Sequence, residues 1–130
     1  LLAVSLLSFG TSTSRAFAAP QLVLAVTSGD PNNIRVDGSN TITITATATD
    51  SGSCNSTYQG VVVQWTASRG TLSVTSSSAA TSASSTGSNC QATITFRGNG
   101  STGTANITAV IRSPGAAVGQ LTVTITSGTI

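Results

Sequence analysis

The sequence predicts an all-β fold, a two-sheet sandwich of about seven short strands. Three observations lead to this expectation. Segments that alternate apolar residues with threonine recur along the chain, and clusters of Gly, Ser, Asn and Asp separate them. The length of 130 residues, with 38% hydrophobic content, suits a single core. Threonine branches at its β-carbon, which fits a pleated strand and disfavours a helix. We therefore expect one β-sandwich domain over residues 19–130.

The clearest strand is predicted over residues 41–49 (TITITATAT), where threonine alternates with Ile or Ala without a break. The same period of two recurs in residues 91–97, 104–112 and 120–126. Residues 21–27 and 60–67 predict two more strands, and residues 71–75 a short one. The side chains expected to face the core in the four clearest strands are Ile42, Ile44, Ala46, Ala48, Ala92, Ile94, Phe96, Ala105, Ile107, Ala109, Ile111, Leu121, Val123 and Ile125.

Residues 73–88 form a low-complexity tract that consists almost entirely of Ser, Ala and Thr. We expect a polar edge strand followed by a mobile loop. The alternative is a linker that carries O-linked glycans, although such linkers usually contain more proline.

Residues 1–18 have the pattern of an export signal. An apolar run (LLAVSLLSF, residues 1–9) precedes a small polar stretch, and Ala16 and Ala18 occupy the positions that signal peptidase inspects. The run is far shorter than the roughly 20 apolar residues that span a bilayer, so no stable membrane span is expected. If residues 1–18 are instead retained as an N-terminal tail, the apolar run must pack against its own domain or a neighbouring subunit.

Two cysteines, Cys54 and Cys90, agree with export. An even cysteine count in an oxidising compartment predicts one disulfide, and two free buried thiols are the alternative. No metal site is expected, because the chain lacks His and two thiolates do not complete a zinc shell. The acids Asp30, Asp37 and Asp50 are too scattered for a calcium loop. No cofactor is predicted.

Charged residues make up only 6% of the chain, five basic and three acidic. The sequence has no His, Glu or Lys, which removes the usual general bases and argues against an enzyme. The arginines occur singly and without aromatic clusters, so nucleic acid is not expected as a partner. A surface with so little charge lacks self-repulsion, which permits self-association.

Three segments, taken in order, carry a resemblance to a known family. They are DGSNTITITATATDSGS (residues 37–53), GVVVQWTASRGTLS (residues 60–73) and CQATITFRGNGSTGTANITAVI (residues 90–111). Together they resemble the bacterial Ig-like domain of the invasin and intimin type, over about 90 residues. The resemblance implies an immunoglobulin-like sandwich and a role at a cell surface.

The two cysteines replace loop residues at landmarks of that family. In an Ig-like sandwich the second and fifth strands are antiparallel neighbours. Cys54 follows the former strand and Cys90 opens the latter, which places both cysteines at the same end of the domain. The resemblance thus implies a Cys54–Cys90 bridge, worth roughly 3 to 4 kcal/mol by the chain-entropy estimate.

Other landmarks have modest expected roles. Trp65 is an inward residue of its strand, and Ig-like folds often bury an aromatic there, so we expect a core side chain. Tyr58 lies in a predicted loop, where it could be an exposed contact. Asn55, Asn99 and Asn106 begin N-x-Ser/Thr triplets and are expected to be exposed, although a chain this rich in Ser and Thr produces such triplets by chance.

We expect a secreted, extracellular or cell-surface structural module, most simply a homopolymerising filament or pilus-like subunit with homomeric strand-edge contacts. The donor strand would be residues 1–9 if these are retained, or residues 21–26 if they are not. Alternatively, residues 21–26 are the first strand of their own domain. The second functional expectation is an adhesin module that binds a host protein or glycan.

Overall fold

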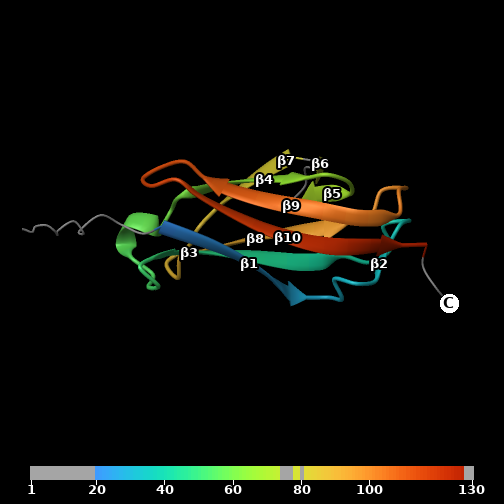
Figure 1. The fold of residues 1–130 in the computed structure, drawn as a ribbon, viewed down its shortest axis with the longest axis horizontal. Coiled ribbons are helices and arrows are strands. Elements are labelled where there is room, and N and C mark those ends of the chain that lie inside the picture. The colour runs from blue at the N-terminus through green and yellow to red at the C-terminus, as the bar shows by residue number, and fades with distance from the viewer. Residues whose placement is uncertain (1–19, 74–77, 80, 128–130) are drawn as a thin grey trace, which may run out of the picture.

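The computed structural model describes residues 20–73, 78–79 and 81–127, which form two five-stranded sheets packed face to face (Figure 1). The prediction of an all-β, two-sheet sandwich is confirmed. The predicted export signal of residues 1–18 lies outside the described residues.

The first sheet has the strand order β1-β3-β8-β5-β6, and all its neighbours are antiparallel. The second sheet has the order β2-β10-β9-β4-β7; its β2–β10 pair is parallel and the other pairs are antiparallel. The first sheet consists of β1 (Pro20–Ser28), β3 (Ile42–Asp50), β8 (Gln91–Arg97), β5 (Thr71–Ser73) and β6 (Ser78–Ala79). The second consists of β2 (Ile34–Arg35), β10 (Ala117–Thr126), β9 (Gly103–Ile111), β4 (Val62–Ala67) and β7 (Thr81–Ser85).

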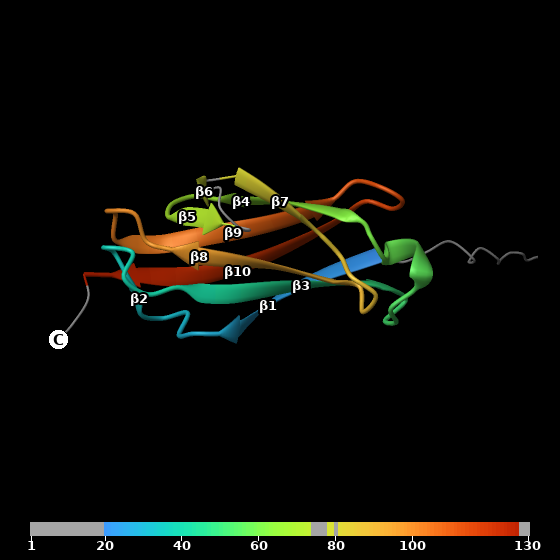
Figure 2. The same cartoon turned by 180° about the vertical axis from the view of Figure 1, so that it is seen from behind.

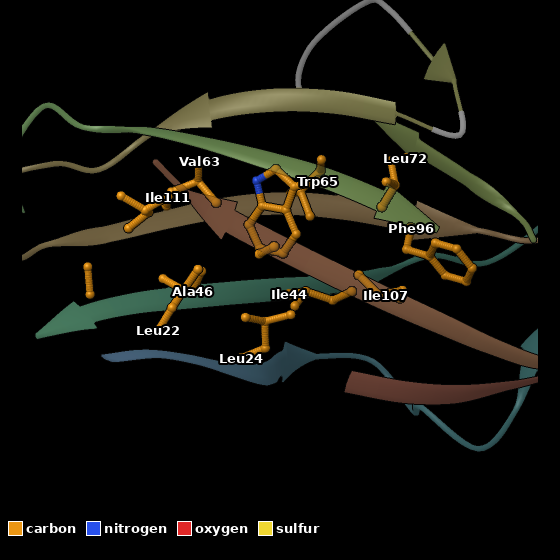
Figure 3. Close-up of a cluster of buried hydrophobic side chains, with 14 of the residues drawn as sticks. Leu22, Leu24, Ile44, Ala46, Val63, Trp65, Leu72, Phe96, Ile107 and Ile111 are labelled. Atoms are coloured by element: carbon orange, nitrogen blue, oxygen red, sulfur yellow. The ribbon is translucent and has the colours of Figure 1, made fainter. Parts of the chain in front are cut away.

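The core lies between the sheets and is filled by the apolar residues of the alternating strands (Figure 3). Thirteen of the fourteen side chains predicted to face inward are buried, whereas Leu121 is only partly buried and packs against the core margin. Thr45 is buried although it belongs to the outward set. Its hydroxyl lies 3.0 Å from that of Thr27 on β1, and this hydrogen bond satisfies the polar group.

The described residues contain ten strands, so the expected number of about seven is too low. The short strand β2 was not predicted, because two residues show no periodicity. The tract of residues 73–88 was predicted as one edge strand and a loop. In the structure it supplies two edge strands in different sheets, β6 and β7, and residues 74–77 and 80 lie outside the described part of the chain.

Residues 21–26 belong to β1 of their own domain, where they pair with β3. The strand also passes close over β10 at Gly119. A Cβ atom placed on Gly119 would lie 2.5 Å from the backbone oxygen of Leu22, so only glycine allows this approach. The edge strand β1 of the first sheet therefore packs against β10 of the second sheet on this side of the sandwich.

The two ends of the sandwich differ. One end, the disulfide end, holds the 3-10 helix η3 (Ser56–Tyr58), the β9–β10 hairpin and the start of β1. The opposite end, the far end, holds the loop from β1 to β2 and the end of β10, where Thr126 pairs with Arg35. The chain thus enters the sandwich at one end and leaves it at the other (Figures 1 and 2).

Candidate functional site

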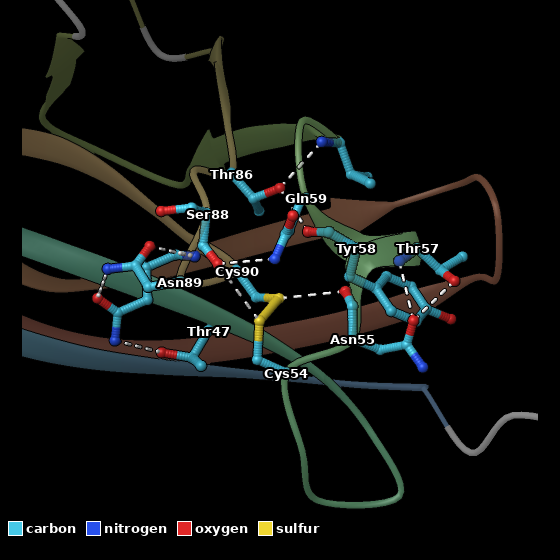
Figure 4. Close-up of a disulfide and its surroundings, with 12 residues drawn as sticks. Thr47, Cys54, Asn55, Thr57, Tyr58, Gln59, Thr86, Ser88, Asn89 and Cys90 are labelled. Atoms are coloured by element: carbon cyan, nitrogen blue, oxygen red, sulfur yellow. Dashed lines mark hydrogen bonds between the residues drawn. A yellow bond between two sulfur atoms is a disulfide. The ribbon is translucent and has the colours of Figure 1, made fainter.

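The disulfide joins the loop after β3 to the residue that precedes β8 (Figure 4). Cys54 and Cys90 are bonded, with their Cα atoms 5.7 Å apart and 36 positions apart in the sequence. β3 and β8 are antiparallel neighbours, and the Ala48 amide donates to the Cys90 carbonyl at 2.9 Å. The predicted bridge and the reason for its position are both confirmed.

The segment after Cys54 is fixed by a dense set of hydrogen bonds. Asn55 caps η3, because its Oδ1 accepts from the Thr57 amide at 2.9 Å and from the Thr57 hydroxyl at 2.8 Å. The buried Thr86 hydroxyl donates to the Tyr58 carbonyl at 2.6 Å and accepts from the Val61 amide at 2.9 Å. Residues 55–61 are therefore tied to the strand pair β4–β7.

A groove of about 390 Å³ opens on the outer face of the second sheet, beside this fixed segment. Its volume is in the range of small-ligand sites. Its lining residues are Thr57, Gly60, Val61, Val62, Gln64, Val110, Arg112, Ser113 and Pro114. The groove is therefore formed by β4, the start of the β9–β10 hairpin and the segment that the disulfide anchors.

Exposed valines mark the apolar part of this face. The side chains of Val62 and Val118 are 53% and 60% exposed, and Val118 pairs directly across the strands with the partly buried Val110. We call Val62, Val110 and Val118 the valine patch. The patch is unusual on an outer face whose other residues are mainly Thr, Gln and Ser.

Arg112 supplies the charge of the groove. Its Nε donates to the Gln64 Oε1 at 2.9 Å, which orients the guanidinium group. Of the nine lining residues, Arg112 alone is charged, and none is acidic. The groove therefore suits a partner that combines a carboxylate with a small apolar surface.

The sequence did not identify these groove residues. The inward positions of Val63 and Trp65 imply by alternation that Val62 and Gln64 face outward, so this part could have been found. The approach of Val62, Val110 and Val118 depends on strand register, which the sequence pattern does not reveal.

Two predicted aromatic positions have different outcomes. Trp65 is fully buried, and its Nε1 donates to the Ser84 hydroxyl at 2.8 Å. The prediction that Tyr58 could be an exposed contact is wrong, since its side chain is 2% exposed. The helix η3 turns the ring inward, and its hydroxyl lies beside Gly115 of the β9–β10 hairpin.

The asparagines of the three triplets are exposed and make hydrogen bonds. Asn55 caps η3, and Asn106 accepts from the Thr122 hydroxyl at 3.1 Å. The side-chain amide of Asn99 donates to the Gly70 carbonyl at 3.5 Å. Their glycosylation stays a prediction.

The three acids lie apart. Asp30 accepts a hydrogen bond from the Asn32 amide at 2.9 Å, and Asp50 lies at the end of β3. Asp37 forms an ion pair of 3.9 Å with Arg35, and the pKa of its carboxyl is lowered, first by a side-chain hydrogen bond from Ser39. No group of three or more potential metal ligands occurs in the part of the chain that the structure describes. The described residues also contain no helix with the length and apolar character to span a membrane.

Comparison with known proteins identifies the fold but not a family. No protein-family model matches the chain, and no curated protein has significant sequence similarity to it. Several solved structures match.

One is the D0-D1 domain of intimin, with a TM-score of 0.57 and 19% identity, over 81% of this chain and 47% of that one. Another is a glycosyl hydrolase family 2 member from Bacteroides cellulosilyticus, with a TM-score of 0.57 and 17% identity, over 82% of this chain and 14% of that one. The chain therefore spans less than half of either protein structure. At these identities the likeness concerns the fold, and the fold is that of a bacterial Ig-like domain.

Proposed function

We propose that this chain is a non-catalytic structural module of a bacterial surface, and that its copies associate into a linear extracellular array. The observation that carries the proposal is the direction of the chain. β1 begins at the disulfide end and β10 ends at the far end, so a module adds the length of the sandwich to any assembly that continues from both ends. This arrangement suits a spacer or a filament subunit.

Export to an oxidising compartment is supported by the disulfide. Structural disulfides persist mainly in secreted and surface proteins. The Cys54–Cys90 bond adds a covalent link to a loop that η3 and its hydrogen bonds already order. The resemblance to invasin and intimin domains supports the same surface setting.

The proposal of a non-catalytic role rests on the chemistry of the side chains. The sequence has no His, Glu or Lys, and its three acids lie in separate parts of the structure. General acid–base catalysis by side chains needs such groups to converge on one site. The groove offers Arg112 and Gln64, which can bind and orient a carboxylate but have no base beside them.

Contacts between copies could use the strand edges, as the sequence suggested. β1 has no charged residue, and Val23 on its outer side is 58% exposed. The part of this edge that β10 does not already approach, as it does at Leu22, can accept a strand from a neighbouring copy through main-chain hydrogen bonds. A bulge between Val26 and Ser28 limits the regular part of this edge to residues 20–26.

The test is the state of assembly of the purified, oxidised protein. Size-exclusion chromatography and electron microscopy over a range of concentrations should show linear oligomers. Val23→Lys places a charge on the β1 edge and should weaken any edge pairing, whereas Thr93→Lys on the outer face of β8 is the matched control inside the same sheet. A protein that stays monomeric at every concentration would contradict the array.

An adhesin module is the second candidate, and the groove is the observation that favours it. The groove combines apolar walls with an oriented guanidinium group, as binding sites often do. Saturable binding of a host protein or glycan by strictly monomeric protein would decide for this function.

A further inference from the structure

We propose that the groove of one copy receives the turn at Asp30 from the far end of the next copy. This contact rests on the proposed array and names the surfaces that would build it. The two surfaces lie at opposite ends of the same sandwich, so each copy can offer its groove to one neighbour and its turn to another. Such a head-to-tail contact between two different surfaces leaves one groove and one turn open after each addition, so further copies can add in a line.

The groove supplies a positive charge and an apolar floor. The Arg112 guanidinium is held by Gln64 through its Nε, so its two terminal amino groups can donate to a different partner. No acidic residue lines the groove, so a carboxylate that arrives there meets no competing negative charge. The exposed Val62 beside Arg112 lies on the apolar floor, where it can contact a small apolar side chain.

The Asp30 turn supplies the complementary features. Asp30 and Asn32 are exposed, and Pro31 adds a compact apolar ring between them. The turn is already ordered, because the Asn33 amide donates to the Asp30 carbonyl at 3.2 Å and the Thr124 amide donates to the Pro31 carbonyl at 2.8 Å. A preformed turn loses little conformational entropy on docking.

The other acids of the chain are less suited to this role. Asp37 forms an ion pair of 3.9 Å with Arg35 on its own domain. Asp50 lies at the disulfide end, where its backbone pairs with that of Ser53. The groove is at this same end, so in a head-to-tail contact Asp50 does not meet the groove of a neighbouring copy. Asp30 is thus the carboxylate that best complements Arg112 across an end-to-end contact.

The contact is small, so weak association that depends on salt is expected. Sedimentation velocity of the full oxidised chain, from micromolar to millimolar concentration and at low and high salt, would measure it. Arg112→Asp and Asp30→Arg should each raise the concentration at half-association by at least about 10-fold. Arg97→Asp, which reverses an exposed arginine outside both surfaces, is the matched control and should have little effect.

Mixing the two charge-reversed proteins gives the decisive result. The Asp30→Arg turn fits the Arg112→Asp groove, and the remaining groove and turn are unchanged, so an equal mixture should associate as the natural chain does. If a reversal impairs folding by circular dichroism, Arg112→Gln and Asp30→Asn replace it, and each variant alone should associate less than the natural chain. Their equal mixture should form pairs through the one natural combination that remains, the Arg112 groove of one variant with the Asp30 turn of the other, but not a longer array.

Two results would overturn the contact. The first is a natural chain that remains monomeric at millimolar concentration and low salt. The second is association that neither reversal changes. If in that case Val23→Lys abolishes the oligomers, the array stands and is built by strand edges, so the failure of this contact is distinguishable from the failure of the proposed function.

Discussion

Trp65 shows at the scale of one residue how the core is held together. It projects from β4 between the two sheets with no exposed surface (Figure 3). Its indole N–H donates to the Ser84 hydroxyl on β7. Its large ring is buried, and its polar group is satisfied at the same time. Few residues in the chain are aromatic, 4% in all, so this ring supplies an unusually large share of the apolar volume.

We expect Trp65→Ala to lower the free energy of unfolding by about 3 to 5 kcal/mol, because the surrounding strands cannot fill the cavity. Trp65→Phe keeps a ring in place but loses the hydrogen bond to Ser84, and should cost less. Urea denaturation followed by circular dichroism measures both. Equal losses for the two variants would show that the hydrogen bond, and not the buried volume, dominates.

Cys90 and its bridge operate at the scale of the element. Cys90 has a φ of 62°, a left-handed backbone conformation that is rare for a residue with a side chain. Its amide donates to the Gly87 carbonyl at 3.0 Å, so the turn before β8 is fixed by backbone contacts as well as by the disulfide. The bridge then adds Cys54 and the start of η3 to this turn.

Replacement of both cysteines by alanine should lower the free energy of unfolding by about 3 to 4 kcal/mol, since the bridge restricts a long loop in the unfolded chain. Hydrogen exchange should also accelerate locally, more at the amides of Tyr58 and Val61 than at that of Ala109 in the centre of β9. Chemical reduction of the natural chain is the control and should reproduce both effects. An unchanged denaturation midpoint would show that the backbone contacts suffice without the bridge.

The sequence predicts best those strands in which apolar and polar residues alternate, because this alternation shows which side chains are buried. In β3 and β8 each inward apolar residue is followed by an outward polar one, so both existence and phase could be predicted, with boundaries within one residue. The tract that contains β6 and β7 has a single apolar residue larger than alanine, Val74, and so shows no apolar alternation; its assignment to two sheets depends on tertiary contacts. The groove likewise depends on the register that brings Val110 opposite both Val118 and Gln64.

At the scale of the whole molecule, the sandwich is stabilised with almost no contribution from charge. Five basic and three acidic residues are spread over 130, and the described residues show one ion pair, at the exposed Asp37. Exposed pairs of this kind contribute little. Stability must come from the apolar core, the strand hydrogen bonds and the disulfide, none of which changes protonation near neutral pH.

The free energy of unfolding should therefore be nearly constant from about pH 5 to pH 8, because the sequence has no His, Glu or Lys and both cysteines are oxidised. Asp37 sets the acid limit. Its pKa is lowered in the folded chain, chiefly by the Ser39 side chain, so its contribution is present above the unfolded pKa and is lost as the pH falls through the folded pKa. Denaturant midpoints should be measured from about pH 8 down to about pH 2. The midpoint should stay constant at first and should decline only below about pH 4. Asp37→Asn should reduce part of that decline, and a transition centred near pH 6 to 7 would contradict this account of the charges.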